Sequence, residues 1–407
     1  MATAPATNPI PPHVPANLVE MFDFRTDAGF RANPHQRLEE FRDRYRAFYT
    51  PYPRGLTGAG IWVLTNGNDI RTVLQDSDSF ASGGLRPFGK VLGEDWGLIP
   101  VDLDPPVHGK FRAMLNPIFS PKRIAALEVN VTSRCSELLA PLKQKAGGDF
   151  MVDFARPFPV SIFLELMGLP LDRMPYFVEL AEGVLHGAGP EEQVTAIRQL
   201  RDYLATQIAQ KRAKPSDDLM GMAVTAKVDG RPLTEGEVMG LCFMLFIGGL
   251  DTVTSTLGFV FHHLATHPDQ QARLRANPAM ISDAAEELLR LYNVVITGRR
   301  ATRDVDIAGV TIKEGDQLAL PTTFASRNPA EFANPGEADL TRNPNRHSAF
   351  GFGPHRCIGS HLARRELVLA LEGWLSQMPP FQLAEGAAIQ CSGTGVVCVE
   401  SLPLRWD

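Results

Sequence analysis

A single cysteine in a glycine-rich loop has the clearest potential for chemistry in this chain. The loop, residues 350–359, reads Phe-Gly-Phe-Gly-Pro-His-Arg-Cys-Ile-Gly, so Cys357 comes directly after His355 and Arg356. Glycines admit positive-φ turns whose amide groups can point at one sulfur, and neighbouring cations favour a thiolate over a thiol. A polarised thiolate shielded by its own loop predicts a ligand for iron.

Two other interpretations of this loop stay open from the residues alone. Cys357 could be a buried structural cysteine in a glycine-rich turn. It could also be a nucleophile paired with His355, although the sequence offers no obvious third group to orient that histidine.

A polar interruption in the most apolar stretch, residues 239–261, is the second candidate for chemistry. Residues 248–252 read Gly-Gly-Leu-Asp-Thr. Paired glycines let another group approach a helix backbone closely, and a threonine can bond back to a carbonyl and bend the helix. An aspartate there is costly without a partner. The structural alternative is a kinked core helix with a salt-bridged acid.

The same stretch is long enough to span a membrane, but the polar residues at its middle favour a buried helix in a large core. Thr234 and Glu237 form a capping box that predicts where this helix begins. Two charged pairs share helix faces elsewhere in the chain. They are His108 with Arg112, spaced i, i+4, and Glu287 with Arg290, spaced i, i+3.

The spacing Phe-x-x-Gly-x-x-x-Cys-x-Gly, met at Phe350, Gly353, Cys357 and Gly359, resembles the haem-binding loop of the cytochrome P450 family. The other motifs follow the family's order over nearly the whole chain. The resemblance implies a mainly α fold with a small β region (α+β) and a long central helix across the haem. It also implies one domain, residues 1–407, with residues 1–16 as an extended arm.

The resemblance assigns roles to particular residues. Cys357 would bind the iron of haem b, Asp251 would relay protons, and Thr252 would hold the activated oxygen or its water. Arg342 would join Glu287 and Arg290 in a buried cluster that braces the cysteine loop. The remaining cofactor contacts are expected at His108, Arg112, Arg299, His355, Phe350, Gly351, Gly359 and Gly248. Substrate contacts are expected at Phe88, Trp96, Met244, Ile247, Val295 and Val396.

The implied activity is that of a soluble bacterial monooxygenase that uses O2. Electrons would come from a [2Fe-2S] ferredoxin and an FAD-dependent NADH ferredoxin reductase, with docking near Lys110, Arg112, Arg364 and Arg365. Family members that hydroxylate camphor have a tyrosine where this chain has Trp96, so the expected substrate is another compact apolar molecule of terpenoid or norisoprenoid size. A peroxide-using peroxygenase and a non-catalytic haem sensor or carrier are the alternatives.

Composition excludes several other classes of partner. The net charge of −6 and pI near 6.0 give no reason to expect nucleic acid or an acidic membrane surface. The five cysteines form neither a metal-ligand spacing nor an even-numbered framework, which favours a reducing cytoplasm. Residues 1–16 contain five prolines and no secretory pattern. We expect a cytoplasmic monomer without a membrane span.

The elements that must position these residues follow from periodicity and turn signals. Helical spacing occurs in residues 34–45, 69–75, 121–146, 159–188, 193–212 and 361–377. Strands are expected at 60–65, closed by an Asn66-Gly67 turn, in a hairpin over 299–317, and at 389–399 around a Gly393-Thr394-Gly395 tip. Residues 82–100 are expected to form a loop with embedded aromatic side chains.

Overall fold

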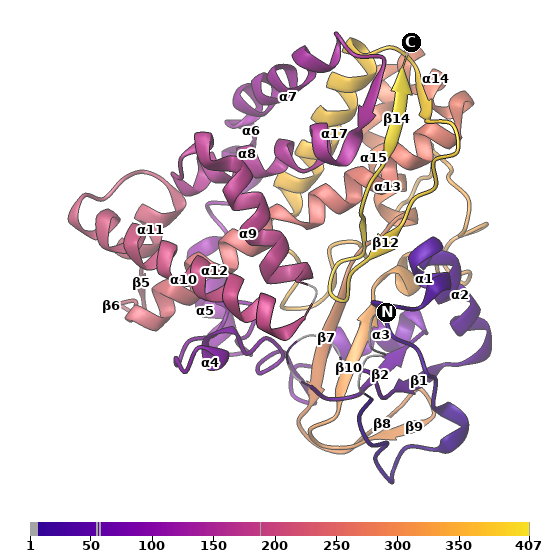
Figure 1. Ribbon diagram of the computed structural model, residues 1–407. Coiled ribbons are helices and arrows are strands. Elements are labelled where there is room, and N and C mark those ends of the chain that lie inside the picture. Colours follow the sequence, from indigo (N-terminus) through magenta and orange to yellow (C-terminus); the bar gives the residue numbers. More distant parts are fainter. Residues whose placement is uncertain (1–6, 54–55, 57, 188, 407) are drawn as a thin grey trace.

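The computed structural model describes residues 7–53, 56, 58–187 and 189–406, and helices dominate it. Figure 1 shows a helical region that carries α5 to α12 and, below it, a sheet formed by the N-terminal strands and by β7 and β10. The main helices are α2 (Pro34–Arg44), α3 (Gly67–Gln75), α5 (Val107–Leu115), α7 (Glu128–Leu142), α8 (Pro157–Met167), α9 (Met174–His186), α10 (Pro190–Ala213), α12 (Glu235–Leu250), α13 (Thr252–Thr266), α14 (Pro268–Ala276), α15 (Ile281–Leu291) and α17 (Ser360–Gln377). The expected mainly α fold with a small β region is confirmed.

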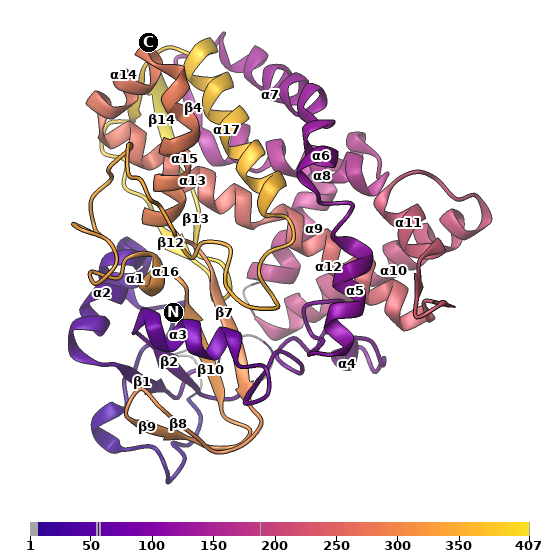
Figure 2. The same cartoon turned by 180° about the vertical axis from the view of Figure 1, so that it is seen from behind.

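Shorter helices connect these. They are α1 (Ala28–Ala32), α4 (Phe88–Val91), α6 (Pro121–Ala125), α11 (Leu219–Thr225) and α16 (Thr323–Ser326). α4 lies inside the stretch expected to be a loop, and a positive φ of 68° at Gly168 ends α8 before α9 begins. Figure 2, the view from behind, shows α17 beside α15.

One five-stranded sheet joins distant parts of the chain. Its strand order is β1 (Ala47–Thr50), β2 (Ile61–Leu64), β10 (Gln317–Pro321), β7 (Ile296–Ala301) and β3 (Phe80–Ala81). Only the β2–β10 pair is parallel, and β10 pairs with β7 so that Leu318 lies opposite Arg299. A second sheet has the order β11 (Phe381–Leu383), β14 (Pro403–Trp406) and β4 (Gly147–Asp149).

Three small strand pairs complete the β structure. They are β5 (Lys227–Val228) with β6 (Arg231–Pro232), β8 (Val305–Ile307) with β9 (Val310–Ile312), and β12 (Cys391–Ser392) with β13 (Cys398–Val399). The expected hairpin over 299–317 contains β8 and β9, whose turn has positive φ at Ala308 (55°) and Gly309 (81°). The expected strands at 389–399 are also present.

One local expectation differs from the structure. Asn66 does not close a hairpin: its side-chain oxygen accepts from the backbone N–H groups of Asn68 (3.0 Å) and Asp69 (3.3 Å), so it caps α3. The N-terminal segment is attached to the sheet from residue 8 onward. Asn8 donates its backbone N–H to Pro51 O (3.0 Å), and His13 lies 2.9 Å from Asp316.

The long apolar stretch forms two helices, α12 and α13, that meet at Asp251. The capping box of Thr234 and Glu237 begins α12, as expected. Buried side chains of α12 belong to one hydrophobic cluster and those of α13 to another, so the break lies where the chain passes between two cores. Residues 235–266 are long and apolar enough to cross a membrane, but 67% of their most apolar window is buried, as in a core helix.

A buried ionic cluster connects α15 to the segment that precedes the cysteine loop. Arg290 donates from Nε and Nη2 to the two carboxylate oxygens of Glu287, each at 2.8 Å, and both side chains are fully buried. Arg342 adds a contact of 3.0 Å from its Nε. The other Arg290 hydrogens go to the carbonyls of Ser326 and Glu337. The expected cluster is therefore assembled.

Removing the charge of Glu287 tests how much the fold depends on this cluster. Glu287→Gln leaves two buried guanidinium groups without their carboxylate, so we expect a loss of ~3–5 kcal/mol in the free energy of unfolding. Glu137, whose ion pair with Arg134 (2.6 Å) is solvent-exposed, supplies the control. Glu137→Gln should cost ~0–1 kcal/mol. Equal losses for the two variants in urea denaturation would contradict the assignment.

Candidate functional site

One cavity of about 430 Å³ lies between the cysteine loop, the α12–α13 junction and strand β7. Cys357, Asp251 and Thr252 all line it, although they come from distant parts of the sequence. The loop that contains α4 closes another side. The cavity therefore brings together the two stretches for which the sequence predicted chemistry.

The backbone of the cysteine loop requires its glycines. Gly351 and Gly353 have φ values of 69° and 67°, and a Cβ at Gly353 would lie 2.4 Å from the carbonyl oxygen of Leu74. Cys357 donates its backbone N–H to Phe350 O at 2.8 Å. Phe350 and Gly351 line the cavity as expected, whereas Gly359 begins α17 behind the cysteine and does not.

The thiol of Cys357 is accessible from the cavity, although protein atoms surround it on its other sides. Burial raises its pKa, and the Gly359 amide and the charges of Arg112 and Arg356 offset this only in part. The ligand role of Cys357 therefore stays a prediction, in which bound iron would add to the effect of the neighbouring cations and amides. A metal ion that binds the sulfur displaces the proton outright.

Two arginines of a basic cluster border one end of the cavity, and one of them, Arg86, has its Nη1 3.5 Å from Asp102 Oδ1. Arg299 on β7 is buried and lines the cavity, and in the described part of the chain it forms no ion pair. Burial and the nearby Arg86, which also lines the cavity, lower the pKa of Arg299 to about 10. The buried guanidinium of Arg299, which has no acid in an ion pair with it among the described residues, creates a demand for an anion at this end of the cavity.

Two histidines belong to the same cluster. Their rings are 4.1 Å apart, and His355 lines the cavity with its Nε2 3.1 Å from Ser82 Oγ. Burial and the charge of Arg299 lower the pKa of His355 to about 3, so its ring is neutral at pH 7. His108 is buried, and its Nε2 has no partner among the described residues. His108 therefore lies behind His355 instead of lining the cavity.

Arg112 differs from the expectation. Its Nη1 donates to the carbonyl of Arg356 at 2.7 Å, and the side chain does not line the cavity. It supports the cysteine loop from outside, because α5 places it next to the loop backbone. The expected contact of Arg112 with a bound cofactor stays a prediction.

The glycine pair on α12 has two different uses. A Cβ at Gly249 would lie 2.2 Å from the ring of Phe163, so this glycine admits a core side chain. Gly248 lines the cavity, as expected for a close approach by another group. Thr252 is not the residue whose hydroxyl bonds back to the helix. That role belongs to Thr254 and Thr256, whose hydroxyls donate to the carbonyls four residues earlier at 2.9 and 2.8 Å.

His186, at the end of α9, is a site residue that sequence reasoning missed. Its Nε2 lies 3.1 Å from Asp251 Oδ1, and both residues line the main cavity. They also line a second cavity of about 50 Å³, whose wall includes Glu182 and Arg156, themselves 2.9 Å apart. No spacing signal links positions 186 and 251. Only the tertiary structure reveals the partner that this aspartate needs.

Five of the six expected substrate contacts line the cavity: Phe88, Met244, Ile247, Val295 and Val396. Trp96 does not. Its indole Nε1 donates to Glu94 Oε2 at 2.5 Å and its ring packs on Phe243 at 5.0 Å. The carboxylate of Glu94 accepts the hydrogen bond of the indole N–H outside the cavity. The expectation of an indole donor facing the substrate is therefore wrong, and Arg86 and Gln193 are polar lining residues that it overlooked.

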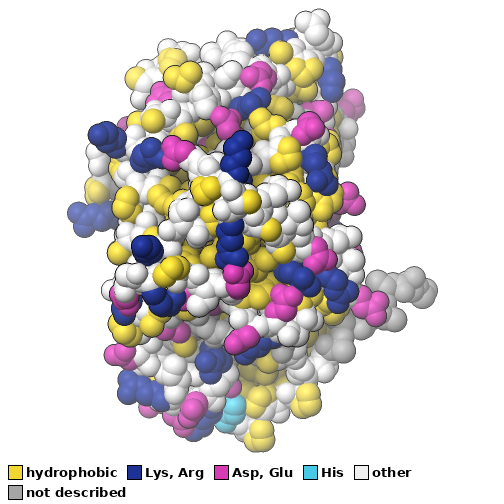
Figure 3. All heavy atoms as spheres, turned by 90° about the vertical axis from the view of Figure 1, so that its left-hand side faces the viewer, with side chains coloured by type: hydrophobic (Ala, Val, Ile, Leu, Met, Phe, Trp, Pro, Cys, Tyr) yellow, Lys and Arg dark blue, Asp and Glu magenta, His cyan; other side chains and the backbone are white. Residues whose placement is uncertain are grey.

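The four cations expected to receive a partner are already engaged within the chain. Lys110 pairs with Asp229 (2.5 Å), Arg364 with Glu286 (2.7 Å) and Arg365 with Glu128, while Arg112 binds a carbonyl. On the face shown in Figure 3, basic and acidic side chains are interspersed. The docking side therefore remains a prediction.

The fold and the cysteine-lined cavity place the chain in a known class. A family model for cytochrome P450 matches residues 190–378. A probable cytochrome P450 127A1 of Sinorhizobium fredii is 42% identical, covering 98% of this chain and 97% of the relative. The chain belongs to the cytochrome P450 family. It is therefore a monooxygenase whose cofactor is haem b.

Other relatives are enzymes and solved structures of bacterial type. The 20-oxo-5-O-mycaminosyltylactone 23-monooxygenase of Streptomyces fradiae is 32% identical, with 86% of this chain and 84% of the relative covered. The crystal structure of cytochrome P450 CYP101C1 superposes with a TM-score of 0.86 at 34% identity and covers 98% of this chain and 100% of its own. CYP101J2 has the same TM-score and coverage at 33% identity.

The His186–Asp251 contact predicts a pH-dependent contribution to stability. Burial is the largest single influence and lowers the pKa of His186, but the charge and hydrogen bond of Asp251 and the charge of Glu182 together outweigh it and raise the pKa. The stabilisation is complete below the unfolded pKa of about 6.5 and is lost as pH rises through the higher folded value. We expect the Tm of the wild type to fall relative to that of His186→Asn as pH rises.

Asp251→Asn supplies the matched partner variant for this measurement. Asp251→Asn should lose the same pH-dependent part of the stability as His186→Asn. The double variant should lose no more of that pH-dependent stability than either single variant. Calorimetric scans across the pH range check this. Parallel Tm curves for the wild type and His186→Asn would show that the contact carries no such dependence.

Proposed function

We propose that this protein hydroxylates a compact apolar substrate with O2 and with electrons from a [2Fe-2S] ferredoxin, reduced by an FAD-dependent NADH ferredoxin reductase, in the cytoplasm. The observation that carries the proposal is that Cys357, Asp251 and Thr252 share one cavity with apolar side chains. A ligand for the cofactor, groups for proton delivery and a site for an apolar molecule then lie together.

The residues present fit haem b. Cys357 would bind the iron. Arg299 has no carboxylate in an ion pair with it among the described residues and would hold a propionate by charge-assisted hydrogen bonds. Arg86, whose Nη1 is 3.5 Å from Asp102, would share its remaining donors with the second propionate. Gly248 and Gly351 would let a flat macrocycle approach the backbone. Bound haem supplies O2 activation, which a thiolate ligand favours by donating electron density.

The chain's own residues would deliver protons and exclude water. His186 orients the carboxylate of Asp251 at the boundary between the two cavities, so a proton can pass from the small cavity to an oxygen of Asp251. Thr252, whose hydroxyl has no protein partner within the described residues, would hold a water in the main cavity. Phe88, Met244 and Ile247 would keep bulk water out.

The lining supports a substrate of terpenoid or norisoprenoid size. Five of the expected aromatic and aliphatic side chains border the cavity. In pockets of this kind, a small number of polar side chains fix the orientation of the ligand. Arg86 and Arg299 would be neutralised by the haem carboxylates. No lysine lines the cavity in the described part of the chain to bind a substrate carboxylate.

Substitution of the acid and the alcohol tests the monooxygenase mechanism. With a ferredoxin system and a substrate, Asp251→Asn should slow turnover by ~10²-fold, the scale of a lost general acid. Thr252→Ala should continue to consume NADH but release peroxide in place of product, since the positioned water is lost. Product, peroxide and NADH are quantified together, and an unchanged ferrous carbon monoxide spectrum confirms intact ligation.

Thr266→Ala is the control, because that hydroxyl bonds to His262 O at 3.0 Å and lines neither cavity. Its coupling of NADH to product should equal that of the wild type. Equal coupling in Thr252→Ala would contradict the assigned role. If product forms faster from peroxide than from NADH, the protein is a peroxygenase instead. If no product forms by either route, it is a haem sensor or carrier.

Optical titration of the spin shift tests the substrate class. An ionone should bind well and a long-chain fatty acid poorly, because no free cation would remain for its carboxylate. Camphor should bind more weakly than the ionone, since Trp96 directs its indole N–H to Glu94. Phe88→Ala should weaken ionone binding at least ~10-fold, the equivalent of an aromatic side chain's burial.

Trp96→Phe is the matched control, because this ring lies outside the cavity, and it should leave the ionone titration unchanged. Tight fatty-acid binding would overturn the proposed substrate class. A Trp96→Phe effect as large as that of Phe88→Ala would overturn the assignment of the lining.

A further inference from the structure

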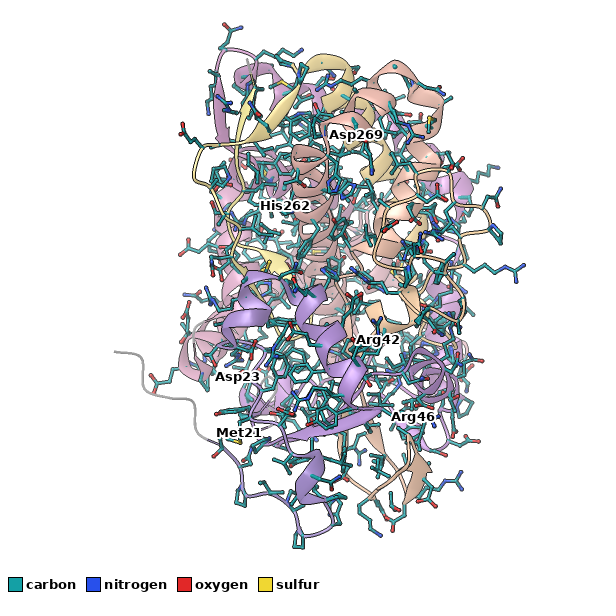
Figure 4. All side chains as sticks on the ribbon, turned by 90° about the vertical axis from the view of Figure 1, so that its right-hand side faces the viewer. Met21, Asp23, Arg42, Arg46, His262 and Asp269 are labelled. Atoms are coloured by element: carbon teal, nitrogen blue, oxygen red, sulfur yellow. The ribbon has the colours of Figure 1, made fainter. Side chains whose placement is uncertain are left out.

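A buried tyrosine and histidine form a pair that the proposed reaction does not use. Tyr292, at the end of α15, lines the same cavity as Cys357. Its hydroxyl oxygen is 2.9 Å from Nδ1 of His263 on α13, and His263 is 2% exposed. Figure 4 views this side of the molecule and labels His262 and Asp269, the neighbours of His263 and Gln270.

The hydrogen bonds around His263 fix which atom carries each proton. Nε2 lies 2.9 Å from the side-chain oxygen of Gln270, which can only accept, so Nε2 carries the hydrogen of the neutral ring. Nδ1 then presents a lone pair, and the tyrosine hydroxyl must be the donor. This tautomer is assigned from the network.

Both members of the pair are neutral at pH 7. Burial lowers the pKa of His263 to about 4 and raises the pKa of Tyr292 to about 12. The proton therefore stays on the phenol in the resting protein. Loss of an electron from the ring would reverse this preference, because an oxidised phenol is a strong acid.

The hydrogen-bond network gives the transferred proton a defined acceptor at His263 Nδ1, although burial disfavours its charge, and it gives a charged tyrosine no such partner. Phe259 stacks against the Tyr292 ring at 5.8 Å and 8°. A radical cation there would be a buried, unpaired charge. An imidazolium at His263 would keep its bond to Gln270 and lie near the carboxylate of Asp269, whereas the neighbouring rings of His262 and His267 act against its charge.

We propose that Tyr292 is a redox-active tyrosine that donates an electron to oxidised haem while its proton passes to His263. Reaction of the haem with one hydrogen peroxide would release one water and leave the haem centre oxidised by two electrons. Tyr292 would return one of these electrons, and the haem would keep the other oxidising equivalent until the ferredoxin reduces it. The O–H bond of Tyr292 breaks, an N–H bond forms at His263 Nδ1, and a neutral phenoxyl radical remains. One electron from the ferredoxin and return of the proton restore the phenol.

This pair would intercept oxidising equivalents formed when no substrate occupies the cavity. The inference needs the haem of the family but not the proposed substrate or the roles of Asp251 and Thr252. Its failure is therefore distinguishable from failure of the proposed function, which is measured as coupled hydroxylation.

The test is rapid-freeze-quench electron paramagnetic resonance of the ferric holoenzyme mixed with hydrogen peroxide without substrate. The wild type should give a tyrosyl radical, and Tyr292→Phe should lose that signal. His263→Gln keeps a carbonyl that can accept the tyrosine hydrogen bond but cannot take its proton, so it should lose the signal too. Both variants should also show faster bleaching of the haem band by peroxide.

Tyr203→Phe is the control. Tyr203 lies on α10, the guanidinium of Arg173 packs over its ring, and it does not line the cavity. Its radical signal should equal that of the wild type. Absence of a tyrosyl radical in the wild type would overturn the proposal. An undiminished signal in Tyr292→Phe or in His263→Gln would also overturn it, since either result removes one member of the pair.

Discussion

The need of one partly buried carboxylate for a partner organises the centre of this molecule. Asp251 interrupts a stretch that is otherwise apolar, and its side chain contacts His186 at 3.1 Å. The helix ends and restarts there, between two hydrophobic clusters. The break places the next residue, Thr252, on the wall of the cavity that also contains Cys357. Packing, helix geometry and the position of the polar groups thus follow from one unfavourable charge.

The same cavity has an electrostatic asymmetry. At one end, Arg86 and Arg299 lie beside two histidines, and burial lowers the pKa of Arg299 to about 10. At the α12–α13 junction, the polar groups are Asp251 and Thr252, set among aliphatic side chains. A cofactor that is flat, apolar and carries two carboxylates on one edge complements such a distribution.

How far the sequence predicts the site depends on how local each interaction is. The cysteine loop and the Glu287–Arg290 pair depend on residues within one turn or one helix, and both are found as predicted. His186 and the Tyr292–His263 pair join separate helices, and no periodicity connects them. Trp96 and Arg112 have the expected chain positions, but each finds a nearer partner, Glu94 and the carbonyl of Arg356, and turns away from the cavity. Asn66 was ambiguous because the same residue type closes turns and caps helices.

The ring of Phe163 in the groove beside Gly249 has a consequence for protein engineering. Any side chain at position 249 would lie within 2.2 Å of that ring, whereas at Gly248 the first obstacle, at 2.8 Å, is the flexible end of Met244. Libraries that aim to reshape the active site can therefore vary positions 244 and 248 together. Diversity at position 249 would instead be removed by misfolding, whatever substrate is selected for.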